Sequence, residues 1–129
     1  MGSPKKSVLI VDDDRALRDL YHKQLEAAGF DVRLAEDGAL GVSEAQTHHP
    51  DLVVLDVNMP DMTGYEALKK LRTFGEWGAH VPVVLLSNAD PNDEENLQSI
   101  EKSSAAYYLE KADMNPQALI VKAKELLGV

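Results

Sequence analysis

The chain contains no cysteine, and it has no long hydrophobic run. The absence of cysteine excludes disulfide bonds, thiolate catalysis and cysteine-based zinc or iron sites. The longest apolar runs, residues 53–55 and 81–86, are far shorter than the roughly 20 residues with which a helix spans a bilayer. No signal-peptide pattern precedes Lys5. We therefore expect a cytoplasmic protein with no membrane partner.

Positive charge is also scarce in this chain. It has 13 Lys and Arg residues against 22 Asp and Glu residues, which gives a formal net charge of −9. Nucleic-acid phosphates would repel such a chain, so direct nucleic-acid binding is not expected. The length of 129 residues suits one domain. We interpret residues 1–6 as a tag remnant or flexible lead and residues 7–129 as the folded domain.

Short apolar runs alternate with amphipathic stretches along the whole chain. The expected strands are residues 7–11, 30–35, 52–55, 81–86 and 105–109. The expected helices are residues 15–28, 39–46, 65–74, 91–102 and a last one that begins at 116, and the segment with Gly75, Trp77 and Gly78 is expected to be a loop. Strict alternation predicts an α/β fold with a single doubly wound, five-stranded parallel sheet.

Polar residues follow the expected strands at the edge where ligands bind in open parallel sheets. They are Asp12 and Asp13 after the first strand, Asp56 after the third, Ser87 after the fourth and Lys111 after the fifth. Converging carboxylates need a cation, and hard oxygen ligands favour Mg²⁺, or Mn²⁺, over zinc. Asp56 could then attack phosphorus and become an acyl phosphate. Lys111 and the metal would supply positive charge, and Ser87 a hydroxyl donor.

Four motifs, in matching order and spacing, resemble the receiver domain of response regulators across residues 7–127. They are LIVDDD at 9–14, VVLDVNMPDMTGYE at 53–66, VVLLS at 83–87 and YYLEK at 107–111. The third-strand motif is the most specific of the four. The resemblance implies a CheY-like, flavodoxin-like (βα)5 fold with strand order 2-1-3-4-5, and a role in a two-component phosphorelay.

The resemblance also implies roles for individual residues. Asp56 corresponds to the phosphoacceptor, and the metal ligands correspond to Asp12, Asp13, Asp56 and the backbone carbonyl of Asn58. The residues that bind the phosphoryl group and switch in the family correspond to Ser87, Lys111 and the aromatic Tyr108. The positions that tune the kinetics of phosphorylation in the family correspond to Asn58, Asn88 and Ala89.

The same resemblance implies partners. A sensor histidine kinase or a phosphotransfer protein would supply the phosphoryl group. A downstream protein would then bind the face formed by residues 91–102, 105–109 and the last helix. We expect a monomer or a weak, phosphorylation-dependent dimer. Such a domain catalyses only its own phosphorylation and dephosphorylation, so it is not an enzyme in the metabolic sense.

Three positions depart from the family pattern. Ala112 follows Lys111 where the family usually has a proline with a cis peptide bond. A cis bond before a non-proline residue costs about 2.5 to 4 kcal/mol, so we expect a trans bond. Asn88 stands where alanine or glycine is usual, and Ser104 where glycine is usual. These departures are expected to affect the kinetics of phosphorylation and the size of the conformational switch more than the phosphoryl-transfer chemistry itself.

Three other functions fit part of the pattern. A receiver-like interaction module with weak or no phosphorylation is kept open by Ala112 and Asn88. A small aspartate-nucleophile phosphohydrolase would need a second aspartate two residues after Asp56, where Asn58 stands. In a flavin binder of the same topology, the three aspartates at 12–14 would repel the flavin phosphate.

Several conspicuous residues are expected to have no role in the site. Asp14 is expected to cap the following helix. Asp61, in the loop after the third strand, is expected to be solvated. His48 and His49 are interpreted as isolated surface residues, and Trp77 as a surface anchor.

Overall fold

The computed structural model describes residues 5–87, 106–110 and 116–129. They form one five-stranded parallel sheet with the order β2-β1-β3-β4-β5. The strands are β1 (Ser7–Val11), β2 (Asp31–Ala35), β3 (Leu52–Asp56), β4 (Val83–Ser87) and β5 (Ala106–Glu110). The predicted fold class and strand order are confirmed.

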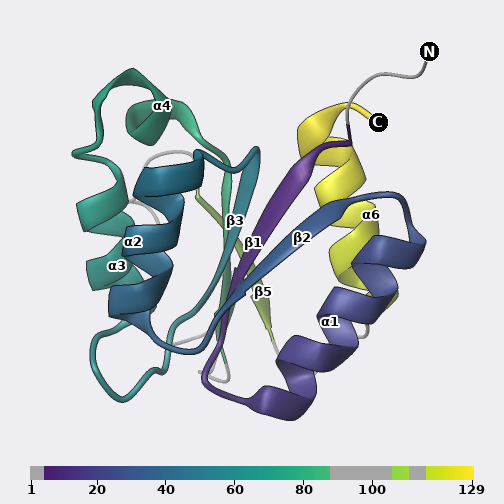
Figure 1. The fold of residues 1–129 in the computed structure, drawn as a ribbon, viewed down its shortest axis with the longest axis horizontal. Helices are drawn as coiled ribbons and strands as arrows, with labels where there is room; N and C mark the ends of the chain where they lie inside the picture. The colour runs from purple at the N-terminus through teal and green to yellow at the C-terminus, as the bar shows by residue number, and fades with distance from the viewer. Residues whose placement is uncertain (1–4, 88–105, 111–115) are drawn as a thin grey trace.

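The described helices cover both faces of this sheet. They are α1 (Arg15–Ala27), α2 (Gly38–His48), α3 (Gly64–Leu71), α4 (Gly75–His80) and α6 (Pro116–Leu127). In Figure 1, α1 and α6 lie on one face, and α2 and α3 lie on the other. The arrangement is the doubly wound one that the alternation of strands and helices predicts.

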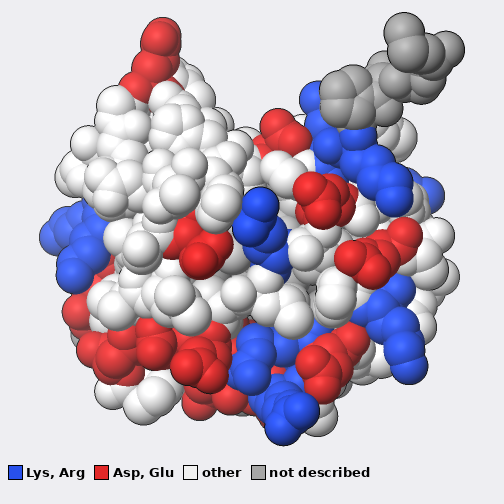
Figure 2. Space-filling model, viewed as in Figure 1, with Lys and Arg blue, Asp and Glu red and all other residues white. Residues whose placement is uncertain are grey.

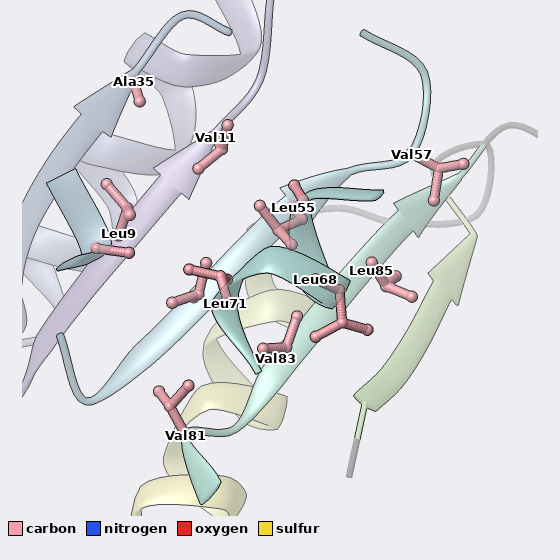
Figure 3. Close-up of a cluster of buried hydrophobic side chains, with 13 residues drawn as sticks. Leu9, Val11, Ala35, Leu55, Val57, Leu68, Leu71, Val81, Val83 and Leu85 are labelled. Carbon is pink, nitrogen blue, oxygen red and sulfur yellow. The ribbon is translucent and has the colours of Figure 1, made fainter. Parts of the chain in front are cut away.

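Each face of the sheet has its own hydrophobic core, because successive strand residues point to opposite faces. Leu9 and Val11 of β1 pack toward α2 and α3, as part of the cluster drawn in Figure 3. Val8 and Ile10 pack in the other cluster, with residues of α1 and α6. The strands β3 and β4 are buried along their whole length, as central parallel strands covered on both faces should be.

The helix α1 begins and ends where the sequence indicates. The side chain of Asp14 accepts hydrogen bonds from Ala16 N (3.0 Å) and Leu17 N (3.2 Å), so its predicted cap is confirmed. Gly29 has a φ of +98°, a conformation that favours glycine. The buried face of α1 is narrow: Tyr21 and Leu25 are buried, whereas Leu20 is 40% exposed.

The expected loop around Trp77 is wrong, because Gly75–His80 forms the short helix α4. Arg72 Nη1 donates to the carbonyls of Gly78 (2.9 Å) and Val81 (2.7 Å), and burial lowers the pKa of this guanidinium. Trp77 Nε1 donates to Pro50 O at 3.0 Å. These tertiary bonds hold a six-residue helix that its glycine-rich sequence does not predict.

The two histidines at the end of α2 do have neighbours. The ring of His49 stacks on Trp77, with centroids 4.4 Å apart and planes 3° apart. His48 Nε2 lies 3.2 Å from the carboxylate of Glu44. Both are exposed, as predicted, but their interpretation as isolated residues is wrong.

Some predictions fall on residues that the structure does not describe. They are the lead before Lys5 and the expected helix at 91–102, together with Ser104 and Ala112. Among the helices that are described, none has both the length and the apolar character that crossing a membrane requires.

Candidate functional site: an acidic pocket at the carboxyl edge

Three carboxylates meet at the carboxyl ends of β1 and β3. These strands are neighbours in parallel register, with Val11 opposite Leu55, so Asp12, just after β1, lies beside Asp56, the last residue of β3. One oxygen each of Asp12, Asp13 and Asp56 lies within 4.8 Å of the other two. Asp12 is fully buried and Asp56 is 2% exposed, whereas Asp13 faces solvent. The predicted convergence of these carboxylates is therefore present.

Backbone contacts hold the β1 end of the pocket from two sides. Asp12 N donates to Ala35 O at the end of β2, at 3.1 Å. Asp14 N donates to Asp12 Oδ1 at 2.9 Å, and Arg18 Nη1 of α1 donates to Asp12 O at 2.8 Å. Both the main chain and the carboxylate of Asp12 are thus oriented by neighbouring elements.

The β3 end of the pocket is held by the loop that follows it. Asn58 N donates to Asp56 Oδ1 at 3.1 Å. Val57 N donates to Leu86 O at 2.8 Å, and Gly64 N donates to Val57 O at 2.9 Å. A β-carbon at Gly64 would lie 2.6 Å from Asp56 O and 2.9 Å from Val57 Cα. The glycine is therefore required for α3 to start this close to the strand.

The chemistry of the pocket suits a hard divalent cation. All three side chains offer carboxylate oxygens, and no histidine belongs to this cluster among the described residues. Mg²⁺ typically takes one or two protein carboxylates and fills its other positions with water or phosphate oxygens. A partly open, all-oxygen pocket fits that coordination better than the closed nitrogen and sulfur sites of structural zinc.

Comparison with known proteins agrees with this geometry. The family model described as the response regulator receiver domain matches residues 8–124. The chain belongs to this family. Figure 2 shows acidic side chains gathered at the left of the lower edge of the receiver domain, with Lys and Arg side chains beside them at the bottom, and β1 ends at this lower edge in Figure 1. The acidic triad of Asp12, Asp13 and Asp56 is typical of the Mg²⁺ site of receiver domains.

Relatives of the receiver domain include longer proteins. This chain is 38% identical over 87 residues to response regulator MprA of Mycobacterium sp. strain KMS, and the alignment covers 67% of this chain and 36% of that protein. This chain is also 34% identical over 116 residues to the DNA-binding dual master transcriptional regulator RpaA of Synechocystis, and that alignment covers 90% of this chain and 47% of the relative. The aligned part of this chain thus spans less than half of either curated relative.

Solved structures match the receiver domain over almost its whole length. Chemotaxis protein CheY4 of Vibrio cholerae superposes with a TM-score of 0.86 at 31% identity, covering 96% of this chain and 100% of that one. A CheY-like receiver domain protein of Methanospirillum hungatei has a TM-score of 0.86 at 29% identity, covering 97% and 95%. The chain is therefore a CheY-like response regulator domain of two-component signalling.

Two further predicted site residues lie on neighbouring strands. Ser87 is the last residue of β4 and is fully buried. Tyr108 of β5 pairs in register with Leu85 and packs, half-buried, against the core on the α3 side. Its neighbour Tyr107 points the other way and is 41% exposed. The predicted site residues Lys111, Asn88 and Ala89 lie outside the described residues.

Asp61 is placed differently from its prediction. Its Oδ1 accepts from Gly38 N at 3.0 Å, and its Oδ2 accepts from Ala39 N at 2.9 Å. These two amides are the main reason that the pKa of Asp61 lies below its ordinary value. Asp61 is exposed, as expected, but its carboxylate also binds these two amides, which the sequence does not predict. No spacing rule connects a loop aspartate to a helix start 22 residues earlier, so sequence reasoning missed this contact.

Proposed function

We propose that this receiver domain accepts a phosphoryl group on Asp56 from the phosphohistidine of a sensor histidine kinase or phosphotransfer protein. The observation that carries the proposal is the clustering of the buried Asp56 with Asp12 and Asp13. Two carboxylate charges separated by 4.8 Å repel by roughly 3.5 kcal/mol at an effective dielectric of about 20. A bound cation would offset this repulsion, and with it a phosphoryl group could enter the pocket.

Asp12, Asp13, Asp56 and the backbone carbonyl of Asn58 would hold Mg²⁺, or Mn²⁺ in its place. When bound, the metal supplies positive charge to the phosphoryl oxygens. A carboxylate oxygen of Asp56 forms the new bond to phosphorus while the bond from phosphorus to the histidine nitrogen breaks, and the nitrogen keeps the electron pair. The Asn58 amide orients the Asp56 carboxylate for this attack.

Phosphorylation would then change the surface that partners contact. In this proposal the Ser87 hydroxyl and the Lys111 ammonium bind the phosphoryl oxygens, and Tyr108 turns inward as Ser87 moves. A downstream protein reads the face that includes β5 and α6; the expected helix at 91–102, which belongs to the same proposal, lies outside the described residues. Shifting such an equilibrium from 1:99 to 99:1 requires about 5.5 kcal/mol of differential stabilisation. Asn58, Asn88 and Ala89 tune how long the phosphoryl group persists.

The test is phosphorylation with acetyl phosphate and Mg²⁺, followed by intact mass measurement. We expect one phosphoryl adduct on the native chain and none on Asp56→Asn. The matched control is Asp51→Asn, which changes an aspartate that immediately precedes the same strand. No adduct on the native chain, or an undiminished adduct after Asp56→Asn, would contradict the proposal. The former result would favour a receiver-like interaction module.

A further inference from the structure

The loop between β3 and α3 is fixed at its base by its own hydrogen bonds. Asn58 and Thr63 form an isolated antiparallel bridge across it. Thr63 Oγ1 accepts from Glu66 N at 3.1 Å and so caps α3. Nothing in this set of bonds orients the tip of the loop, residues 59–62, relative to the rest of the pocket.

The tip is held by the N-terminus of α2, through Asp61. The first four amides of a helix have no partner within the helix. In α2, Asp61 accepts from Gly38 N and Ala39 N, and the side chain of Asp37 accepts from Leu40 N (2.8 Å). Gly41 N makes the first bond of the helix itself, to Asp37 O (2.9 Å). The amides of residues 38–40 are therefore satisfied by side chains, and two of these three depend on a residue from another loop.

Packing supports the same contact between loop and helix. A β-carbon added at Gly38 would collide with the side chain of Met62, the residue after Asp61. The absence of a side chain at Gly38 lets Met62 lie directly against the helix start. The tip of the loop thus meets α2 through both oxygens of a carboxylate and through an apolar side chain.

These contacts complete a series of bonds that connects the two buried aspartates of the acidic pocket. Asp12 N binds Ala35 O, and the chain runs from Ala35 into the start of α2. Asp61 links that start to the β3–α3 loop, and Asn58 N in the same loop binds Asp56 Oδ1. The series therefore begins at one buried aspartate, Asp12, and ends at the other, Asp56.

We propose that Asp61 is a positioning residue: it anchors the loop after β3 to α2 and thereby holds the Asn58 carbonyl and the Asp56 carboxylate in place for the metal. This inference rests on the proposed function, since it concerns the affinity of the same pocket for Mg²⁺. Outer partners that orient metal ligands are known to affect metal affinity without contacting the ion. Asp61 acts in that way, through the backbone of its loop.

The test compares three variants by titration calorimetry with Mg²⁺ alone, which measures the dissociation constant of the metal. Asp61→Ala removes both acceptors, and we expect a dissociation constant about fivefold higher, at the low end of coupling between sites. Asp61→Asn keeps one acceptor, so we expect a smaller increase. Asp37→Ala is the matched control, because it removes an acceptor from the same helix start without touching the loop. We expect its Mg²⁺ affinity to equal that of the native chain.

A second measurement separates positioning from general stability. Coupling is reciprocal, so Mg²⁺ should shift the amide NMR signals of Gly38 and Ala39 in the native chain. Those shifts should vanish in Asp61→Ala and persist in Asp37→Ala. If Asp61→Ala does not fold, the comparison of Asp61→Asn with Asp37→Ala decides the question.

The possible failures can be told apart. If the native chain binds Mg²⁺ and is phosphorylated on Asp56, but the Asp61 variants bind the metal as tightly as it does, only this inference is overturned. Equal weakening by the Asp61 and Asp37 variants would also overturn it, because the effect would then belong to the helix. A native chain that binds no Mg²⁺ would overturn both proposals.

Discussion

At the amino ends of β1 and β3, the carboxylate of Asp51 accepts hydrogen bonds from Ser7 N (2.8 Å) and Ser7 Oγ (3.3 Å). At the carboxyl ends of the same two strands, Asp12, Asp13 and Asp56 lie against one another. In the first arrangement one carboxylate oxygen, Asp51 Oδ2, accepts from two donors of the adjacent strand. The second brings like charges together, which costs stability until a cation binds.

Other contacts at the amino edge also tie elements together. Asp31 N donates to Lys6 O at 2.9 Å, and Trp77 Nε1 donates to Pro50 O. The amino edge therefore stabilises the fold, whereas the carboxyl edge carries the site. Because the strands between them are the same, the two edges can be compared by substitutions of the same kind at each.

The largest effect on stability is expected from Gly64→Ala at the carboxyl edge. The added methyl group would meet the backbone of Asp56 and Val57, which cannot move aside as a flexible side chain could. We expect the free energy of unfolding to fall by about 3 kcal/mol, at the upper end for overpacking. Chemical denaturation in metal-free buffer measures it.

The control for this substitution is Gly29→Ala at the amino edge. A β-carbon added at Gly29 would meet no heavy atom within 4 Å, but the residue has a φ of +98°. The left-handed conformation alone should cost about 1 kcal/mol. Equal losses in the two variants would show that the close approach of α3 to β3 carries no extra cost.

The next effect is expected from Asp51→Ala at the amino edge. It removes the acceptor of the Ser7 amide and hydroxyl, a partly buried set that joins β1 to β3. Hydrogen bonds to charged groups contribute about 1.5 to 3 kcal/mol, so we expect a loss of about 2 kcal/mol in unfolding free energy. Ser7→Ala keeps the hydrogen bond from the residue 7 amide to Asp51, so thermal unfolding should show a smaller loss of stability. An unchanged midpoint for Asp51→Ala would contradict the stabilising role of this edge.

Asp12→Asn at the carboxyl edge should act in the opposite direction. The amide oxygen can still accept from Asp14 N, while one charge of the cluster is lost. We expect the free energy of unfolding without metal to rise by about 1 kcal/mol, a fraction of the full Coulomb repulsion. Added Mg²⁺ should stabilise the native chain more than the variant, because the variant has lost a ligand. If the variant is less stable than the native chain in metal-free buffer, repulsion among these carboxylates does not destabilise the carboxyl edge.

The smallest effect concerns the pH dependence of the Asp61 contact. The amides of Gly38 and Ala39 hold the pKa of Asp61 below its ordinary value of 3.8. A lowered pKa in the folded state stabilises the protein above pH 3.8, and that contribution is lost as the pH falls through the folded-state pKa. The difference in unfolding free energy between the native chain and Asp61→Asn should therefore shrink in acid. A difference that stays constant into that range would contradict this assignment.

Much of the fold was predictable because its signals are local. Uninterrupted apolar runs marked the two central strands β3 and β4, which are buried on both faces. Asp14 marked the start of α1 as its cap, and Gly29, just after the helix, has the positive φ that favours glycine. The helix α4 was missed because its six residues are held by Arg72 and Trp77 rather than by their own helical preference.

The candidate site divides in the same way. Asp12, Asp13, Asp56 and Ser87 follow strands directly or end them, so the parallel sheet places them at one edge from their sequence positions alone. Asp61 has no such relation to a strand, and its bonds to α2 depend on how a loop crosses to another element.

The sequence by itself thus determined the alternation of strands and helices, the family, and which carboxylates follow which strands, because each depends on neighbouring residues along the chain. Only the tertiary structure decided that these carboxylates lie within 4.8 Å of one another, that Asp61 belongs to the start of α2, and that Trp77 holds α4 in place. The physical reason is that these contacts join residues from separate elements, and their distances are set by packing across the sheet rather than by spacing along the chain.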